Sequence, residues 1–201
     1  MTNVNIDIRI TLLKESYLKG SVFKMNKIST KKIVLSGLMI ALVFLTTRVT
    51  VIPVGQGYFN VGDVAIMITA VFLGRNSGFA AGAIGSALCD LLSGYGFYAP
   101  ITFIVKGIEG YIVGTIAYSA GNNSKGEFRR IIAVLVGSLI MVAGYFIADM
   151  YIMGFLGQNA GYAAAVANFI PVNLTQGIVC SVLGYTLITL LERSNIRKII
   201  N

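Results

Sequence analysis

Long apolar runs alternate with short polar connections along most of the chain. Only helices and closed barrels satisfy the backbone in lipid, and a helix needs about 20 apolar residues to cross the hydrocarbon core. The second run is short, and the last is long enough to tilt or to contain a break. We therefore predict an all-α membrane protein, a six-transmembrane-helix bundle. Its spans are approximately 33–52, 60–74, 77–94, 100–120, 130–153 and 163–191.

The positions of the basic residues predict the orientation. Lys and Arg are retained in short cytoplasmic loops, and with six spans fourteen of the 16 fall on one side. Both termini should then be cytoplasmic, as in a multi-pass protein of the bacterial plasma membrane. The residues on that side are Arg9, Lys14, Lys19, Lys24, Lys27, Lys31, Lys32, Arg75, Lys125, Arg129, Arg130, Arg193, Arg197 and Lys198.

This pattern divides the chain into three parts. Residues 1–32 form a basic, flexible cytoplasmic N-terminus, residues 33–193 form the transmembrane domain, and residues 194–201 form a cytoplasmic tail. Met25 looks like a more natural start, so residues 1–24 are either a tail or a wrongly assigned beginning. No convincing cleavage site follows the first span, which we expect to be retained.

Composition narrows the functional class. The chain is 56% hydrophobic and 12% charged, which is typical of an integral membrane protein. Its net charge of +8 comes from residues at the ends of apolar runs, so the expected partner is the lipid bilayer and no nucleic acid. The absence of histidine removes Ser-His and Cys-His nucleophile pairs, and no P-loop is present. We expect no enzyme, metal or cofactor, although a Ser-Lys dyad at Lys106 stays open.

Lys106 and Glu109 place two charges inside the fourth span. A spacing of three residues puts them about 60° apart on a helix, so they can neutralise each other. They form either a self-satisfied ion pair or part of a polar pocket, since intramembrane charges face protein or a wet cavity. The other charges in or beside the membrane are Arg48, Asp63, Asp90 and Asp149.

Further polar side chains favour the pocket. Tyr145 and Asp149 share a face near the outer end of the fifth span, and Asn173 and Gln176 share one on the last span. They follow Pro171, whose missing N–H loosens the helix. Together with Lys106 and Glu109, they should line an outward-facing cavity that binds a small polar molecule.

The loop "RVTVIPVGQGYFNVGD" mixes apolar residues with glycines. It suits a lid over the cavity, with Tyr58 and Phe59 available to stack on a ring and Asn60 beside them. An ordinary structured surface loop is the alternative. We expect Asp63 to cap the second span rather than to bind a ligand.

Small residues at helical spacing predict close helix packing. Gly78 and Gly82 belong to such a stripe on the third span, and Gly110 belongs to one on the fourth. For both stripes we favour packing within the bundle. Gly37 and Ala41 form a small-residue pair on the first span, which either packs within the bundle or docks to another membrane protein.

Several motifs in order resemble one known family. They are the basic start leading into "LSGLMIAL", then "PVGQGYFNVGD", "GFAAGAIGSALCDLLSG" and "IPVNLTQGIV". Across residues 27–195, the chain is similar to the substrate-binding S component of energy-coupling factor (ECF) vitamin transporters. The resemblance implies binding of a water-soluble vitamin in an outward pocket, with a transmembrane coupling protein and two cytoplasmic ATPases as partners. The family's docking motif corresponds to Gly37 and Ala41.

The resemblance leaves the vitamin open. The most similar subgroup is linked to hydroxymethylpyrimidine, pyridoxine-type compounds and riboflavin, and the lack of tryptophan argues against a thiamine pocket. We favour a hydroxymethylpyrimidine- or pyridoxine-like substrate, with riboflavin next. The alternative function is a stand-alone secondary transporter that couples a small polar solute to protons through Glu109, Asp90 or Asp149.

Overall fold

A computed structural model describes residues 29–118, 124–194 and 196–200. The predicted N-terminal segment 1–32 lies almost wholly outside the described residues. The helical domain is the compact unit Lys31–Asn201, to which α2 belongs except for its first residue. The helices are α2 (Thr30–Val49), α3 (Gly62–Leu73), α4 (Arg75–Ala80), α5 (Ala87–Leu92), α6 (Ala99–Ala117), α7 (Ser124–Ile147), α8 (Tyr162–Asn168), α9 (Thr175–Arg193) and α10 (Arg197–Ile200).

Short π-helical and 3₁₀ segments join several of these helices. The π-helical segments are η1 (Ala81–Ser86), η2 (Ala148–Ile152) and η4 (Phe169–Leu174), and η3 (Met153–Leu156) is 3₁₀. Thus α4, η1 and α5 form one continuous helical run, as do α7 with η2 and η3, and α8 with η4 and α9. The predicted loosening at Pro171 falls in η4, where Pro171 has no N–H to donate.

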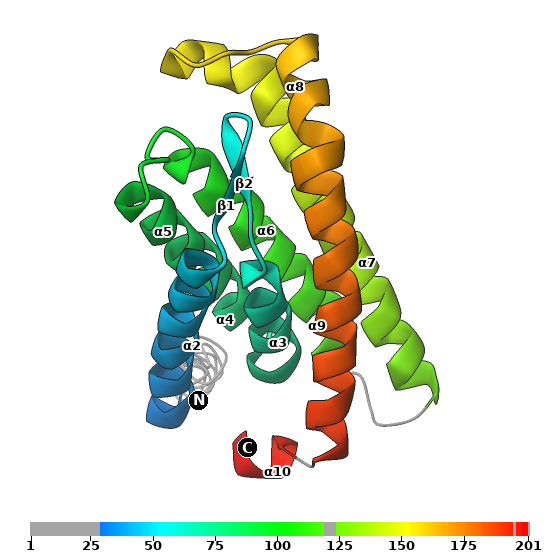
Figure 1. Cartoon of the computed structure of the whole chain (residues 1–201). Coiled ribbons are helices and arrows are strands. Elements are labelled where there is room, and N and C mark those ends of the chain that lie inside the picture. Colours follow the sequence, from blue (N-terminus) through cyan, green and yellow to red (C-terminus); the bar gives the residue numbers. More distant parts are fainter. Residues whose placement is uncertain (1–28, 119–123, 195, 201) are drawn as a thin grey trace, which may run out of the picture. The chain divides into compact units, whose positions relative to one another are not determined.

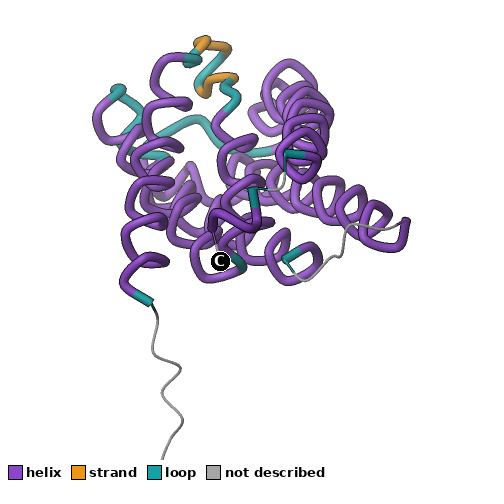
Figure 2. The backbone as a smooth tube through the Cα atoms, turned by 90° about the horizontal axis from the view of Figure 1, so that it is seen from below, coloured by secondary structure: helices purple, strands orange, loops and turns teal. Residues whose placement is uncertain are grey.

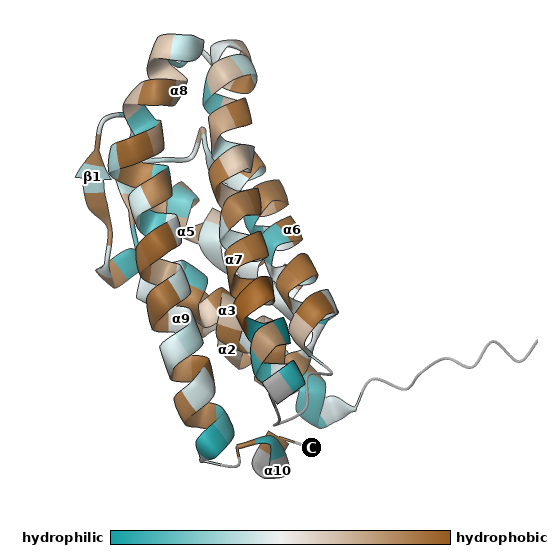
Figure 3. Ribbon diagram, turned by 90° about the vertical axis from the view of Figure 1, so that its right-hand side faces the viewer, coloured by the Kyte–Doolittle hydropathy of each residue, from teal (hydrophilic) through white to brown (hydrophobic). Residues whose placement is uncertain are grey.

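The predicted all-α bundle of six helices is confirmed, but the helices differ in length. Four helical runs of the described chain are long and apolar enough to cross a membrane, namely Thr30–Val49, Ala99–Ala117, Lys125–Leu156 and Tyr162–Arg193. Gly62–Leu73 is apolar but has only 12 residues, about 18 Å of helix. The remaining run consists of α4, η1 and α5. Figure 3 shows mostly apolar residues along α7 and α9.

A small β-hairpin interrupts the helices between α2 and α3. Strands β1 (Ile52–Val54) and β2 (Gly57–Phe59) pair antiparallel, with Pro53 opposite Tyr58. Gly55 begins the two-residue turn at φ +60°, a conformation that glycine adopts without strain. Figure 2 shows helix almost throughout the described chain apart from this hairpin. The hairpin stands between α5 and α9, at the end of the unit away from α10 (Figure 1).

Glycines bring α6 against the run that contains α4 and η1. A Cβ atom at Gly78 would lie 2.6 Å from the carbonyl oxygen of Gly110, and one at Gly82 would overlap the main chain at Lys106. The predicted packing stripes are therefore confirmed at these positions. On α2, in contrast, Gly37 and Ala41 are exposed.

The apolar core forms separate clusters. One contains Met67, Val113 and Ile188, and another contains Tyr98, Met141 and Met153. Lys106 and Glu109 occupy successive turns of α6 and are buried. The core of this membrane domain therefore includes charged groups that need protein partners.

Candidate functional site

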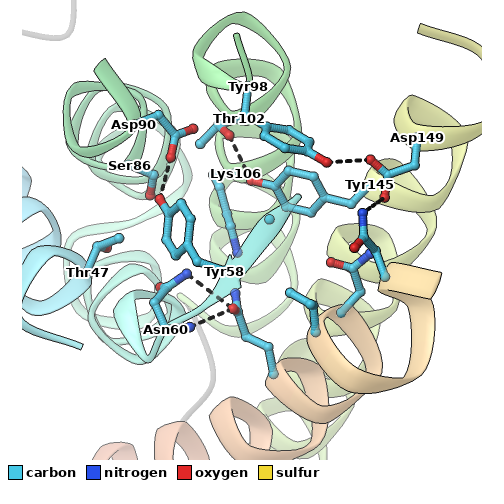
Figure 4. Close-up of a pocket in the computed structure, with 15 residues that line it drawn as sticks. Thr47, Tyr58, Asn60, Ser86, Asp90, Tyr98, Thr102, Lys106, Tyr145 and Asp149 are labelled. Atoms are coloured by element: carbon cyan, nitrogen blue, oxygen red, sulfur yellow. Dashed lines mark hydrogen bonds between the residues drawn. The ribbon is translucent and has the colours of Figure 1, made fainter. Parts of the chain in front are cut away.

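A polar cavity of about 40 Å³ lies beside the hairpin. Its walls come from α2, from β2 and the residue after it, from α6 and the residue before it, and from η1, α5, α7, η2, α8, η4 and α9. Figure 4 shows many of these side chains directed toward one another. The lining residues are Thr47, Gly57, Tyr58, Asn60, Ser86, Asp90, Tyr98, Thr102, Lys106, Tyr145, Asp149, Asn168, Val172, Asn173 and Gln176.

A charged cluster underlies the cavity. The Lys106 ammonium donates to Asp63 and lies 3.6 Å from a carboxyl oxygen of Glu109. It also lies 5.5 Å from the centre of the Tyr145 ring. All three charged residues are at most 2% exposed. The expected Lys106–Glu109 pair exists, but Asp63 is the closer partner.

The loop after β2 is joined to this cluster through an amide. The main-chain N–H of Asn60 donates to Gln176 Oε1 at 2.9 Å, and Asn60 Nδ2 donates to the same oxygen at 3.1 Å. Gln176 Nε2 then donates to Asp63 Oδ2 at 2.8 Å. A continuous hydrogen-bonded path therefore runs from the hairpin to the Lys106 ammonium.

The hairpin makes further contacts on both sides of the cavity. The Tyr58 hydroxyl donates to Asp90 Oδ1 on α5, as Figure 4 shows, and its ring lies 4.7 Å from that of Tyr95. At the turn, Gln56 Nε2 donates to the carbonyl oxygen of Asn159 at 3.0 Å. The hairpin is thus attached to α5 and to the η3–α8 connection.

Asp149 organises another wall. It accepts hydrogen bonds from the Tyr98 hydroxyl at 2.6 Å and from Asn168 Nδ2 at 3.0 Å. Nearby, the hydroxyls of Thr102 and Tyr145 are 2.9 Å apart. These bonds join α6, η2 and α8 around the cavity (Figure 4).

Three cavity-lining side chains keep a buried polar atom without a hydrogen-bond partner in the described structure. These atoms are Thr47 Oγ1, Asp90 Oδ2 and Asn173 Nδ2. Buried polar groups are normally paired. Unpaired groups inside a cavity are therefore candidates for contact with a bound molecule.

Seven of the nine predicted substrate-binding residues lie in the cavity wall. Phe59 and Glu109 do not. Successive side chains of a strand point to opposite faces, so Tyr58 and Asn60 face the cavity whereas Phe59 does not. Glu109 lies about one helical turn beyond Lys106 on α6, outside the lining residues. The residues in the wall are Tyr58, Asn60, Lys106, Tyr145, Asp149, Asn173 and Gln176, and their contact with substrate stays a prediction.

The expectation that Asp63 caps α3 is wrong. Val61 occupies the N-cap position, and no side-chain cap bond is formed there. Both carboxyl oxygens of Asp63 are instead used by Lys106 and Gln176. A single sequence cannot show that α3 and α6 bring these side chains together.

Sequence reasoning did not select the other lining residues as contacts. Asp90 was recognisable as a charge in an apolar run, and Tyr98 as an aromatic residue at the outer level. Asn168 is polar, but it was not selected. The other five are small or apolar residues, which are common in membrane helices and carry no local signal. These six residues are Thr47, Gly57, Ser86, Thr102, Asn168 and Val172.

Membrane helices that enclose a polar cavity beside a hairpin define a membrane protein built to hold a small polar solute. Comparison with known proteins gives its family. Residues 27–193 match the ECF-type riboflavin transporter S component family, and the chain belongs to this family.

Two relatives extend the comparison. A Lactococcus lactis protein named thiamine precursor transporter HmpT is 32% identical over 176 residues, covering 86% of this chain and 94% of that protein. A Pyrococcus woesei protein described as "Uncharacterized protein in gap 3'region" is 39% identical over 139 residues, covering 68% and 86%. The chain is accordingly a substrate-binding subunit for vitamin uptake in the plasma membrane, a transporter component rather than an enzyme.

Proposed function

We propose that this S component binds a single-ring, hydroxylated heteroaromatic vitamin precursor of the hydroxymethylpyrimidine or pyridoxine type. The binding site is the cavity beside the hairpin, and the energy comes from a transmembrane coupling protein with two cytoplasmic ATPases. The observation that carries the proposal is the polar wall, in which carboxyl, amide, hydroxyl and ammonium groups converge from separate helices. Riboflavin is the second candidate.

The size of the cavity supports the smaller ligand. A volume of about 40 Å³ accommodates only a few water molecules, so any ring must displace the surrounding side chains. A single ring requires less rearrangement than a three-ring flavin. The name of the HmpT relative points to the same class of substrate, whereas the name of the family points to riboflavin.

The hairpin suits the role of a lid. Its release requires three attachments to break, namely Tyr58 to Asp90, Gln56 to Asn159, and Asn60 to Gln176. Together they comprise four hydrogen bonds, since Asn60 makes two to Gln176. A neutral bond contributes about 1 kcal/mol net and a bond to a charged group about 1.5–3 kcal/mol, which keeps opening reversible. Burial and the Asp90 carboxylate raise the pKa of Tyr58, so its hydroxyl keeps the proton that it donates.

Exposed Gly37 and Ala41 support the proposed partnership. In the described structure, no atom outside α2 approaches a Cβ placed on Gly37 within 4 Å. Small residues let a neighbouring membrane helix come close. This part of α2 is therefore available to the coupling protein.

The test begins with the purified chain alone. We expect mass spectrometry to detect a co-purified single-ring heteroaromatic, and titration calorimetry to show tight binding of hydroxymethylpyrimidine or pyridoxine. Tight binding of riboflavin with no binding of either single-ring compound would overturn the substrate proposal.

Vesicles test the mechanism of energy coupling. The chain alone should bind substrate without accumulating it, and uptake should require the coupling protein, the two ATPases and ATP. Uptake by the chain alone under a proton gradient would overturn this part. It would favour a proton-coupled transporter that uses Glu109, which is buried and has no hydrogen-bond partner for either carboxyl oxygen in the described structure.

A further inference from the structure

A second polar hollow, the basic pocket, lies at the end of α2 that is remote from the hairpin. It has a volume of about 290 Å³ and is enclosed by the start of α2, the α3–α4 turn and the end of α6. None of the described residues that line it is acidic, and two are basic, so its lining carries a positive charge. The lining residues are Lys32, Gly74, Arg75, Asn76, Gly114, Thr115 and Tyr118.

Close contacts hold the three segments of the basic pocket together. A Cβ atom at Gly114 would lie 2.5 Å from the main-chain nitrogen of Arg75, so the backbone of α6 packs directly on the α3–α4 turn. The hydroxyl groups of Ser36 and Ser77 are hydrogen-bonded at 2.8 Å and join α2 to α4. The basic pocket is therefore a built feature of the fold.

Two tyrosines of α6 and its C-terminal end position the cations. The Lys32 ammonium lies 5.3 Å from the centre of the Tyr118 ring, and the Arg75 guanidinium lies 5.4 Å from the centre of the Tyr111 ring. A cation–π contact orients a basic side chain without neutralising its charge. Tyr111 and Tyr118 are about two helical turns apart, so the cations stand at two heights along α6.

An apolar groove continues from the basic pocket between α4 and α6. Its volume is about 410 Å³, and it is lined by Asn76, Phe79, Ile108 and Tyr111. Asn76 lines both hollows, and Tyr111 makes the contact with Arg75. Phe79 and Ile108 lie about one turn further from the pocket along their helices. The apolar groove therefore leads from the basic pocket toward the membrane interior.

We propose that the basic pocket and the apolar groove together bind one anionic phospholipid of the cytoplasmic leaflet. The headgroup phosphate contacts Lys32 and Arg75, and one acyl chain lies in the groove beside Phe79 and Ile108. The positive-inside pattern places this end of the molecule at the cytoplasmic surface. Basic pockets between membrane helices on that side bind anionic lipid headgroups. The proposal does not depend on which vitamin the hairpin cavity binds.

The distribution of charge favours a lipid over a protein as the occupant. The cytoplasmic ends of membrane proteins are themselves rich in Lys and Arg, so a basic pocket would repel the end of a neighbouring protein helix. A hollow that is basic at one end and apolar along the rest matches the two parts of a phospholipid. Ile108 and Tyr111 are 43% and 36% exposed, so the groove is open to lipid from the side.

Native mass spectrometry of the full chain in detergent tests the proposal. Phosphatidylglycerol and phosphatidylcholine with identical acyl chains are added at equal concentration, and the retained lipids are counted. Each basic residue near an anionic surface contributes about fivefold to binding. The wild-type chain should therefore retain phosphatidylglycerol at least about tenfold better, and equal retention of the two lipids would overturn the proposal.

Charge variants assign the preference to the basic pocket. Arg75→Gln and Lys32→Gln should each lower retention of phosphatidylglycerol about fivefold. Arg193→Gln and Lys125→Gln are the matched controls at exposed positions of α9 and α7, and they should lower it less than about twofold. Equal effects of all four variants would mean that the overall positive charge of the chain attracts the lipid, and the proposal would be overturned.

A variant in the apolar groove distinguishes a phospholipid from a free anion. Ile108→Trp fills the groove without changing the charge and should lower retention of phosphatidylglycerol at least about fivefold. Leu139→Trp, at an exposed position of α7, should leave it unchanged. Soluble sn-glycerol 3-phosphate has the phosphate but no acyl chain and should not displace the lipid. Displacement by this compound, with no effect of Ile108→Trp, would indicate a site for soluble anions and overturn the lipid proposal.

A protein interface at this face would give another result. Arg75→Gln and Ile108→Trp would then leave lipid retention unchanged and lower recovery of the complex with the coupling protein. This outcome would also overturn the proposal. Selective loss of phosphatidylglycerol in the pocket and groove variants, in protein that unfolds at the wild-type temperature, supports it.

Discussion

Lys106 is surrounded by more carboxyl groups than one ammonium can neutralise. Asp63 accepts from it directly, and Glu109 approaches to 3.6 Å. Removing one partner from a buried ion pair leaves an uncompensated charge, whereas replacing the whole pair costs much less. Loss of Lys106 alone should therefore lower the free energy of unfolding strongly. The ion pair as a whole nevertheless contributes little net stability.

We predict that Lys106→Met lowers the free energy of unfolding by about 3–5 kcal/mol. The double variant Lys106→Met/Asp63→Asn should recover part of this loss, because Asp63→Asn removes one of the carboxylates left without a counter-charge. Thermal unfolding in detergent measures both. Lys125→Met, at an exposed position of α7, serves as control and should change stability by less than about 0.5 kcal/mol.

An unchanged melting temperature in Lys106→Met would contradict this account of the cluster. It would mean that Asp63 and Glu109 bind their protons readily once the ammonium is gone. The double variant tests this explanation. If the two carboxyl groups are protonated, the double variant should be no more stable than Lys106→Met.

The sequence could identify a site residue only where the neighbouring residues in the chain carry the signal. Lys106, Tyr145 and Gln176 were found because polar groups in apolar runs must face protein or a cavity. Lys106 and Asp63 are 43 residues apart in the sequence. Neither segment alone shows that the two helices pack together and bring these side chains into contact. Phe59 was misplaced because the loop was not recognised as a strand, in which alternate side chains face opposite sides.

At the scale of elements, π-helical turns bring polar groups to the cavity. Ser86 lies in η1, Asp149 in η2, and Asn173 in η4. A π-bulge adds a residue to a helical turn and is often found at functional sites. The length of the apolar runs could place the six spans, and regular periodicity of 3.6 residues could place side chains on a face, but neither could show these shifts. Only Pro171 gave a local signal, for η4.

The hairpin carried a signal that was not used. "VGQG" places Gly55 first in a two-residue turn, and glycine at this position is typical of a type II′ hairpin. The strands have only three residues each, too short for an alternating pattern to stand out. The lid function stays a prediction, and it can be tested by locking the hairpin.

We predict that a cross-link between Gln56→Cys and Asn159→Cys slows ligand exchange at least about tenfold, because the turn must leave the η3–α8 connection before the cavity opens. The native Cys89 and Cys180 are buried and should not compete. Release of labelled ligand is measured before and after reduction, and Gln56→Cys alone is the control. Equal rates in the oxidised and reduced forms would show that ligand leaves by another route.

Glycine packing at α6 gives a second prediction at this scale. A Cβ at Gly110 would overlap the carbonyl of Gly78, so Gly110→Ala should lower stability by about 1–3 kcal/mol. Gly37→Ala makes the same chemical change where nothing lies within 4 Å in the described structure, and it should raise stability by up to about 1 kcal/mol through helix propensity. Thermal unfolding in detergent compares them, and equal melting temperatures would contradict the packing argument.

The whole molecule separates two tasks between different surfaces. The cavity lies among the helices beside the hairpin, whereas Gly37 and Ala41 occupy the exposed side of α2. Binding and docking should therefore be separable by mutation.

Composition and apolar length were sufficient to predict the helical bundle, because lipid allows few alternatives. They could not show which surface meets a partner, since in membrane helices exposed apolar residues face lipid as readily as protein.

We predict that Gly37→Leu and Ala41→Leu leave ligand affinity within about twofold of wild type but lower recovery of the complex with the coupling protein and ATPases at least about tenfold. The added side chains would hold a neighbouring helix away from α2, and close approach between membrane helices depends on small residues. Co-purification from membranes measures the complex, and calorimetry measures ligand binding. Leu139→Phe adds bulk at an exposed position of α7 and should affect neither.

A complex that assembles normally with both α2 variants would place the docking surface elsewhere on the molecule. A loss of ligand binding in either variant would show that α2 and the cavity are coupled.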